Sequence, residues 1–262
     1  MDKVLQGANI KLSSMASRMN TVSAMDMCRA ISKGEVTPEV LAAMAKGTMK
    51  SKEEELQRAL HGFIQPHQQM MLSSMLDHIT WLDRQIGLLS KEIDRRMQDV
   101  SVLVDALDEI AGIGKDSAQA IIAETGTDMS VFPSAKHLCS WAGLSPGNNE
   151  SAGKKKKAKA RKGNTTLKRK MVQCARSAVK SKGTYLNSLY SRIAARRGAN
   201  IAYMAVARTL LEICYYMIRD GTLYEELGAD YFTKLNREAI VKRSMKRIEE
   251  LGFRVTVEEI AA

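Results

Sequence analysis

The chain has 262 residues, 45% of them hydrophobic, and its 40 Lys and Arg against 29 Asp and Glu give a net charge of +11. This length predicts one or two domains with enough apolar residues for a core, which excludes wholesale disorder. The four cysteines are far apart and form no CxxC pair, which argues against a disulfide framework and fits a reducing cytosol. The apolar runs are too short for a membrane span, and the polar N-terminus argues against a signal peptide.

Residues 1–51 are rich in Met, Ala and Ser, and glycines at 34 and 47 interrupt them. Thr37 followed by Pro38 predicts a helix start, with Thr as N-cap and Pro at the first helical position. We therefore expect short helices here. The opening residues 7–17 have no feature typical of the edge of a domain.

Residues 52–109 form the longest periodic stretch. The apolar or bulky positions repeat at alternating spacings of three and four, as on one helical stripe. They are Leu56, Leu60, Phe63, Ile64, Met70, Met71, Met75, His78, Trp81, Leu82, Leu88, Leu89, Ile93, Met97 and Val100. Pro66 should break or kink the stretch near its start. The pattern predicts an antiparallel helical pair or a coiled-coil dimer, and an ordinary bundle helix is the alternative.

Residues 103–126 resemble a helix-hairpin-helix motif, in which Gly112-Ile113-Gly114 forms a tight turn between two amphipathic helices. Two glycines would let the backbone turn sharply beside a phosphate, and the second helix would point free N–H groups at it. An ordinary helical hairpin is the alternative reading. The acidic side chains around the turn, Asp105, Asp108, Glu109 and Asp116, weaken the case for strong DNA affinity.

Residues 127–153 contain a short helix that begins at Ser134, for which we expect Leu138 and Trp141 to face inward. An irregular loop of small residues follows from Gly143 to Gly153. It lies directly before a lysine-rich run, and loops of this kind concentrate function.

The positive charge is confined to one window of the chain. Residues 151–200 hold 16 basic and no acidic side chains, whereas residues 101–150 have a net charge of −5. Such a block repels itself unless a polyanion neutralises it. Nucleic acid is the expected partner, because the block lacks the apolar face of a membrane-surface helix. A merely solubilising surface is the alternative.

The remaining chain is predicted to be mainly helical. Residues 165–182 and 200–219 are expected to form helices, the first capped by Thr165 or Thr166, and the second is apolar nearly all round, as in a central core helix. Residues 234–251 predict a charged amphipathic helix, and the alternating close from Phe253 predicts one short strand.

The usual catalytic motifs are absent from the sequence. No His or Cys lies at metal-ligand spacing, and neither a phosphate-binding P-loop nor a GxSxG nucleophile motif occurs. No set of carboxylates suggests a two-metal nuclease. The remaining nucleophile candidates are Ser140, Ser145 and Ser151, of which Ser151 is best placed because a dense cluster of cations starts at Lys154.

Three ordered runs carry a family resemblance: residues 112–164, residues 182–198, and residues 219–232, which end in LGADYF. They resemble the C-terminal half of transposases of the insertion-sequence-110 family, whose relatives include the pilin-gene invertases. The resemblance extends from about Ala8 to the C-terminus. Its most specific phrase is HLCSWAGLSPGNNESAGK, at residues 137–154.

The resemblance implies that a full-length member of the family has three segments with different roles. An N-terminal RNase-H-like domain would bind Mg²⁺ through four acidic residues, a coiled-coil region would mediate subunit assembly, and the C-terminal domain would carry the helix-hairpin-helix and a serine nucleophile. That serine matches Ser151. The family recombines DNA through a covalent serine–DNA intermediate, in oligomers, and uses a noncoding RNA to choose its sites.

The resemblance also implies what this chain lacks. The acidic domain is missing, so we expect an N-terminally truncated transposase with no cofactor of its own, Mg²⁺ belonging to the absent domain. The expected location is the bacterial or archaeal cytoplasm, at the nucleoid. Ser151 is the expected catalytic residue. The expected DNA-binding residues are Gly112, Gly114, Lys115, Asn148, Asn149, Lys154, Lys155, Lys156, Lys157, Lys159, Arg161 and Lys162.

The predicted fold is mostly α: a long coiled-coil-like helical arm followed by a compact helical domain that contains the helix-hairpin-helix. We place short helices from an interdomain linker at 1–51, the oligomerisation arm at 52–102 and the transposase domain at 103–262. Within that domain, the serine loop is 143–153 and the basic segment 154–170. Besides strand transfer, two functions stay open: a non-catalytic DNA- or RNA-binding protein that modulates a full-length transposase, and a remnant without a role.

Overall fold

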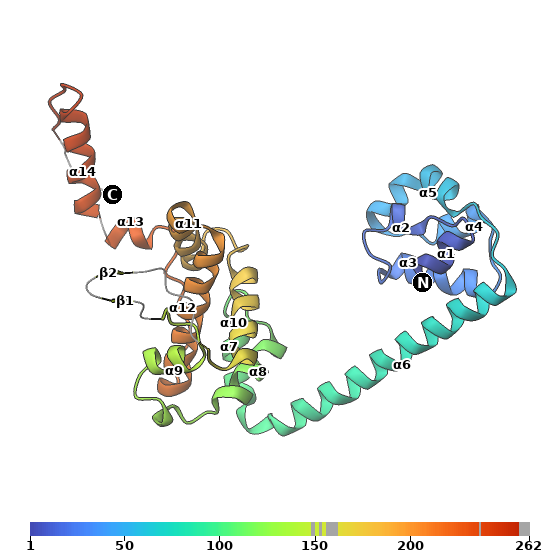
Figure 1. Ribbon diagram of the computed structural model, residues 1–262, viewed down its shortest axis with the longest axis horizontal. Coiled ribbons are helices and arrows are strands. Elements are labelled where there is room, and N and C mark those ends of the chain that lie inside the picture. The colour runs from blue at the N-terminus through green and yellow to red at the C-terminus, as the bar shows by residue number, and fades with distance from the viewer. Residues whose placement is uncertain (148–149, 152–153, 156–161, 236, 257–262) are drawn as a thin grey trace. The chain divides into compact units, whose positions relative to one another are not determined.

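The computed structural model describes residues 1–147, 150–151, 154–155, 162–235 and 237–256. The chain divides into two compact units, unit 1 (Met1–Arg96) and unit 2 (Met97–Ala262). Helices dominate both units, which confirms the mostly α fold class (Figure 1). Among the described residues, the strands are a single pair of two residues each.

Unit 1 begins with short helices, as expected. Their bounds are α1 (Asp2–Gly7), α2 (Leu12–Met15), α3 (Val22–Ser32), α4 (Pro38–Ala43), the 3-10 helix η1 (Gly47–Lys52) and α5 (Glu53–Leu60). Helix α4 starts at Pro38 with Thr37 as the N-cap residue, as the sequence predicted. These helices share a hydrophobic core that includes Leu5, Leu41 and Leu60, all fully buried. Residues 1–51 therefore fold together with the beginning of the expected arm.

Helix α6 (Pro66–Arg96) is the long helix of unit 1. Pro66 occupies its first position, so the break expected at this proline is confirmed. Leu72 and Leu76 are its only buried residues, and they anchor the first turns to the core of unit 1. The helix ends well before residue 109, because the chain passes through a 3-10 turn, η2 (Gln98–Val100), before the next helix starts.

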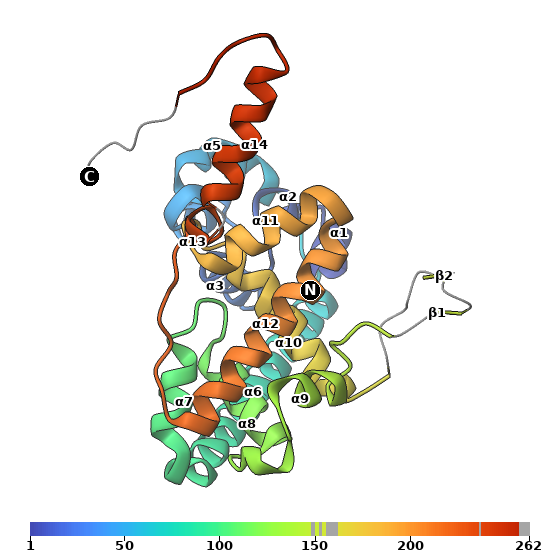
Figure 2. The ribbon, with the colours of Figure 1, turned by 90° about the vertical axis from the view of Figure 1, so that its left-hand side faces the viewer.

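Unit 2 is built on one central helix, α12 (Ala199–Asp220), which packs against helices from elsewhere in the unit. The other helices are α7 (Ser101–Asp108), α8 (Lys115–Thr125), η3 (Met129–Val131), α9 (Ala135–Trp141), α10 (Thr165–Ala178), α11 (Tyr185–Arg197), α13 (Tyr231–Leu235) and α14 (Arg237–Glu249). Strands β1 (Glu150–Ser151) and β2 (Lys154–Lys155) complete it. Figure 2 shows α10 and α11 alongside α12.

The apolarity of α12 is explained by its place in the core. Val206, Leu210 and Cys214 follow one another at helical spacing and are fully buried. Within the described part of the chain, α12 is also the helix whose length and hydropathy would suit a membrane span, and 44% of that stretch is buried inside the protein. A buried core helix has the same composition, so the expectation of a central helix is confirmed.

Two local expectations were wrong, and one helix was missed. Trp141 does not face inward: its side chain is 42% exposed and lies beside the Phe132 ring, with the ring centroids 5.5 Å apart. The residues from Phe253 to Thr256 form no strand, and the rest of the expected strand lies outside the described residues. Helix α11 was not expected at all, because its polar and apolar residues alternate without a strong stripe.

The turn between α7 and α8 depends on Gly112 for a packing reason. Gly112 has a φ of +92°, and a Cβ atom at this position would lie 2.6 Å from the Cys174 carbonyl oxygen and against the backbone of Ala178 in α10. Gly114 differs, since its φ is −94° and its nearest neighbour to an added Cβ, a carboxylate oxygen of Asp108, is 4.0 Å away. Only the first glycine is therefore required by the backbone.

These two glycines provide a matched pair of substitutions. Gly112→Ala should destabilise unit 2 by about 3 kcal/mol, because the left-handed backbone and the forced retreat of α10 each cost roughly 1–3 kcal/mol. Gly114→Ala should cost less than about 1 kcal/mol, because it changes only the N-cap residue of α8. Urea denaturation of the full chain, followed by circular dichroism, measures both. Equal stability of the two variants would contradict the packing described here.

Candidate nucleic-acid interface

The segment that carries the lysine run leaves and rejoins unit 2 at one place, which we call the stem (Trp141–Gly143 with residues 162–164). A Cβ atom added to Gly163 would lie 2.5 Å from both the Trp141 carbonyl oxygen and the Gly143 nitrogen. The backbone N–H of Asn164 donates to the same Trp141 carbonyl at 3.1 Å. Two backbone stretches about twenty residues apart in the chain are thus held in direct contact.

Asn164 also fastens the stem to two helices. Its side-chain oxygen accepts a hydrogen bond from the Leu167 N–H at 3.0 Å, so Asn164, rather than Thr165 or Thr166, caps α10. Its side-chain nitrogen donates to a carboxylate oxygen of Glu124, in α8, at 2.5 Å. A capping side chain of this kind typically contributes about 1 kcal/mol. The start of α10, the end of α8 and the stem are therefore joined through one residue.

Ser151 lies between the two sides of the stem along the chain. Strands β1 and β2 pair antiparallel, with Ser151 opposite Lys154 and Glu150 opposite Lys155. Directly opposed residues have Cα atoms about 4.5–5.5 Å apart, so the hairpin brings the expected nucleophile beside the first lysine of the run. In Figure 2 the pair lies outside the helical body of unit 2.

The other expected site residues differ in their exposure, and several of them lie outside the described residues. Lys162 is exposed at the stem, whereas Asn148, Asn149, Lys156, Lys157, Lys159 and Arg161 lie outside the described residues. Gly114 and Lys115 are exposed where α8 starts, with Gly114 as its N-cap residue. Gly112 is half-buried, with α10 filling the space on its Cβ side. Two helices joined by a tight turn are present, and their contact with a phosphate stays a prediction.

The alternative nucleophiles are partly or fully buried. Ser140, inside α9, and Ser145 are both half-buried. The four cysteines are buried and free, and burial raises the pKa of the Cys28 thiol to about 11 and of the Cys139 thiol to about 12. Such thiols stay protonated at neutral pH and are poor nucleophiles.

The described residues offer no metal site. No group of three or more His, Cys, Asp or Glu side chains among them is arranged to hold a metal ion. They therefore do not fit the Mg²⁺ site that the family resemblance implies for an acidic domain.

One cationic surface was not singled out from the sequence. The outward face of α10 carries Lys168, Arg169 and Arg176, which line a shallow groove together with Val172 and Gln173. The spacing of four residues between positions 168, 172 and 176 is the signal that could have identified this face. Lys168 and Arg169 fall within the predicted basic segment 154–170, and Arg176 lies beyond it; none of the three was expected to contact DNA.

This part of the chain is similar in sequence to a known protein family. Residues 104–191, which include the turn at Gly112, the stem and all of α10, match the sequence model of the transposase IS116/IS110/IS902 family. The chain is also 29% identical over 158 residues to the insertion element IS110 uncharacterized 43.6 kDa protein of Streptomyces coelicolor, a match that covers 60% of this chain and 38% of that protein. The matched part thus spans well under half of the curated relative. Over residues 104–191 the chain is therefore similar to transposases of this family.

Proposed function

We propose that this chain binds DNA through the segment held at the stem and transfers DNA strands through Ser151, as the C-terminal part of an insertion-sequence transposase. The observation that carries the proposal is the concentration of 16 basic and no acidic residues at positions 151–200, inside a matched transposase domain. Cations at this density bind the phosphate backbone, which dominates the affinity of proteins for DNA.

The stem supports this proposal because it fixes both ends of the segment that carries the lysine run. Residues 144–162 begin and end at the same point of unit 2, since Gly163 and Asn164 contact Trp141 and Gly143. Holding the two ends together removes much of the loop-closure entropy that the segment would otherwise lose on binding. Both ends of the segment that carries the lysine run are thereby fixed at one place in unit 2.

The proposed chemistry is an exchange of phosphodiester bonds. The Ser151 hydroxyl oxygen forms a bond to a DNA phosphorus atom, and the bond from that phosphorus to one neighbouring deoxyribose oxygen breaks. The serine proton passes to solvent, and the released deoxyribose oxygen takes up a proton. Neighbouring cations such as Lys154 would stabilise the negative charge that develops on the phosphate oxygens. Attack by a deoxyribose hydroxyl of a second strand then releases the serine, so no oxidant or reductant is needed.

Helix α6 supports a second part of the proposal, which is self-association. Ile79, Ile86 and Ile93 alternate with Leu82 and Leu89 at spacings of three and four residues. The helix buries no residue beyond Leu76, and the side chains of Ile86 and Leu89 are 61% and 65% exposed. Isoleucine at one core position and leucine at the other favour a parallel two-stranded coiled coil. We therefore propose that a second copy of α6, from this chain or a longer relative, covers this stripe.

The same stripe favours one alternative function. A chain that binds DNA or RNA and pairs through α6, but performs no chemistry, would dampen a full-length transposase by forming mixed oligomers. A noncoding RNA partner fits the same cationic surface, because its backbone carries the same phosphates. Covalent chemistry distinguishes the two functions.

Covalent attachment to DNA is the first test. Incubated with end-labelled duplexes from a random-sequence pool, the wild-type chain should form an adduct that survives denaturing electrophoresis. Ser151→Ala should form none, because the attacking oxygen is gone, while Ser145→Ala should behave as wild type. An adduct that persists in Ser151→Ala would contradict the assignment of the nucleophile. No adduct from either chain would favour the non-catalytic function.

The salt dependence of binding is the second test. If six or more phosphates are neutralised, the association constant should fall on the order of 10³-fold between about 50 and 200 mM salt. Fluorescence anisotropy with a labelled duplex measures this directly. A fall of less than about tenfold would show that phosphate contacts are not the source of the affinity.

Self-association through α6 is tested by charges placed on or beside the stripe. Ile86→Asp combined with Leu89→Asp should convert a dimer to a monomer in analytical ultracentrifugation, because the paired helices would bury four carboxylates. Leu88→Asp is the matched control, since Leu88 is 53% exposed and lies off the stripe. A monomeric wild-type chain, or a double variant that stays dimeric, would contradict the coiled coil.

A further inference from the structure

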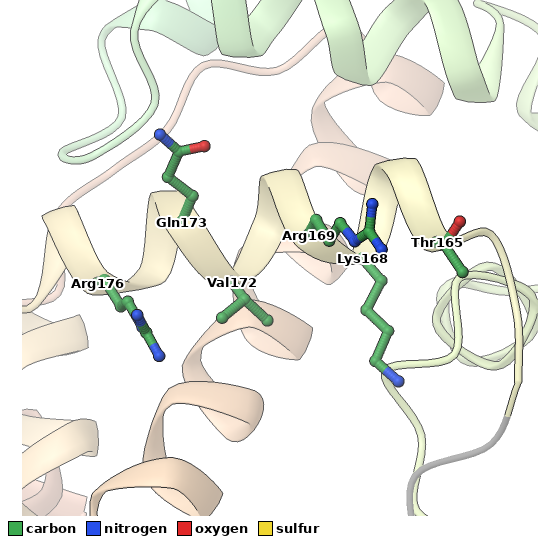
Figure 3. A pocket seen from close by; sticks show the side chains of 6 residues that line it. All are labelled: Thr165, Lys168, Arg169, Val172, Gln173 and Arg176. Carbon is green, nitrogen blue, oxygen red and sulfur yellow. The ribbon is translucent and has the colours of Figure 1, made fainter.

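The outward face of α10 forms a groove with a cationic lining. The groove has a volume of about 430 Å³, and all the residues that line it come from this one helix: Thr165, Lys168, Arg169, Val172, Gln173 and Arg176. Figure 3 shows the side chains of Lys168, Val172 and Arg176 projecting to the same side of the helix. Two cationic ends and an apolar middle therefore share one surface.

This face is held outward by the packing of the opposite one. Leu167, Met171, Cys174 and Ala178 are buried in the core of unit 2, where α10 packs against α8 and α12. The Asn164 cap fixes the first turn of the helix, and the backbone of Gly112 fits closely against its last turn. Because α10 cannot rotate without exposing its apolar face, Arg169 and Arg176 stay on the surface, where both are exposed.

Among the described residues, two of the three cations on this face, Arg169 and Arg176, have no acidic partner. Within the described part of the chain, neither Arg169 nor Arg176 forms an ion pair, and residues 151–200 contain no acidic residue. Two acidic groups on neighbouring helices are engaged elsewhere: Glu124 accepts from Asn164, and Glu212 pairs with Arg208 at 2.9 Å. The charges of Arg169 and Arg176 are thus not balanced by an ion pair, which favours an anionic ligand.

An aromatic pair holds one of these cations in place. The Arg176 guanidinium carbon lies 5.5 Å from the centroid of the Tyr203 ring, and that ring lies 4.8 Å from the ring of Tyr190. A guanidinium stacked on an aromatic ring keeps its N–H donors free at the edges. Arg176 is therefore oriented before a ligand arrives.

We propose that this groove on α10 is a second DNA-binding surface, which holds the phosphodiester backbone of one strand beyond the lysine run. From Lys168 to Arg176 the helix rises about 12 Å, which corresponds to roughly three phosphates of one strand of a duplex. Val172 offers an apolar surface for a deoxyribose between the cations. The inference rests on the proposed function and extends it, since α10 begins directly after the stem and continues the cationic surface along the DNA.

The test compares salt slopes rather than single affinities. Binding of the full chain to a duplex of about 20 base pairs is measured by anisotropy from about 50 to 200 mM salt. Removing two phosphate contacts with Arg169→Gln and Arg176→Gln should reduce the slope of log K against log salt by about 1.8, and lower the affinity at least about tenfold at 100 mM. Arg169→Gln alone, which breaks no described contact within the protein, should reduce the slope by about 0.9.

Two controls separate a local contact from total charge or misfolding. Lys50→Gln with Lys52→Gln removes the same charge from exposed positions of unit 1, and should leave the slope unchanged. Arg169→Lys with Arg176→Lys keeps both charges and should retain the wild-type slope.

Three other outcomes would overturn the α10 surface, the choice of DNA or the proposed function. Arginine variants that match the lysine control overturn the α10 surface while leaving the proposed function in place. A loss seen with an RNA duplex of the same sequence, but absent with DNA, overturns the choice of DNA. A wild-type chain that binds no DNA at low salt overturns the proposed function, and this inference with it.

Discussion

The structure of the interface depends on one close contact between backbones, at the stem. Gly163 has no side chain, and its Cα lies so near Trp141 and Gly143 that a Cβ atom would be 2.5 Å from both a carbonyl oxygen and an amide nitrogen. Asn164 then completes the contact through hydrogen bonds to the Trp141 carbonyl and to Glu124. The start of α10 and both ends of the segment that carries Ser151 and the lysine run are fixed at this point.

In unit 2, the residues that stabilise the fold are different from those that carry the positive charge. The core of unit 2 consists of apolar side chains around α12, which do not depend on the cations of residues 151–200. Those cations would repel one another in a compact core, and several of the described ones, such as Lys162, Arg169, Arg176 and Arg196, are exposed. A bound polyanion would neutralise these cations. The relief of their mutual repulsion would then favour binding.

The sequence allowed the helical class, the start of α4 at Pro38, the break at Pro66 and the buried α12 to be predicted, because each has a strong local signal in capping, proline geometry or apolar composition. It did not allow the roles of Gly112 and Gly163 to be predicted. Both glycines are needed for contacts with residues far along the chain, Cys174 and Trp141 among them, which no local pattern encodes. The cationic face of α10 was overlooked for a related reason, since only the packed helix shows which side of it is outward.

Ser151 illustrates a different limit. Its candidacy came from its place before the lysines and from a family resemblance, and the structure adds that its backbone pairs with that of Lys154. The exposed stripe on α6 was anticipated as part of a longer periodic stretch, but its true extent depends on where Leu72 and Leu76 attach the helix to unit 1. In both cases a local pattern named the segment, and tertiary contacts determine how it is presented.

The central claim is that the segment held at the stem is the part of this chain that contacts DNA. The most direct measurement is the reactivity of each lysine toward an amine-specific reagent, with and without a bound duplex, read by mass spectrometry. We predict that lysines between Lys154 and Lys162 lose most of their reactivity on binding, while Lys50 and Lys52 in unit 1 keep theirs. Equal reactivity of the 154–162 lysines in the free and the DNA-bound chain would contradict the account.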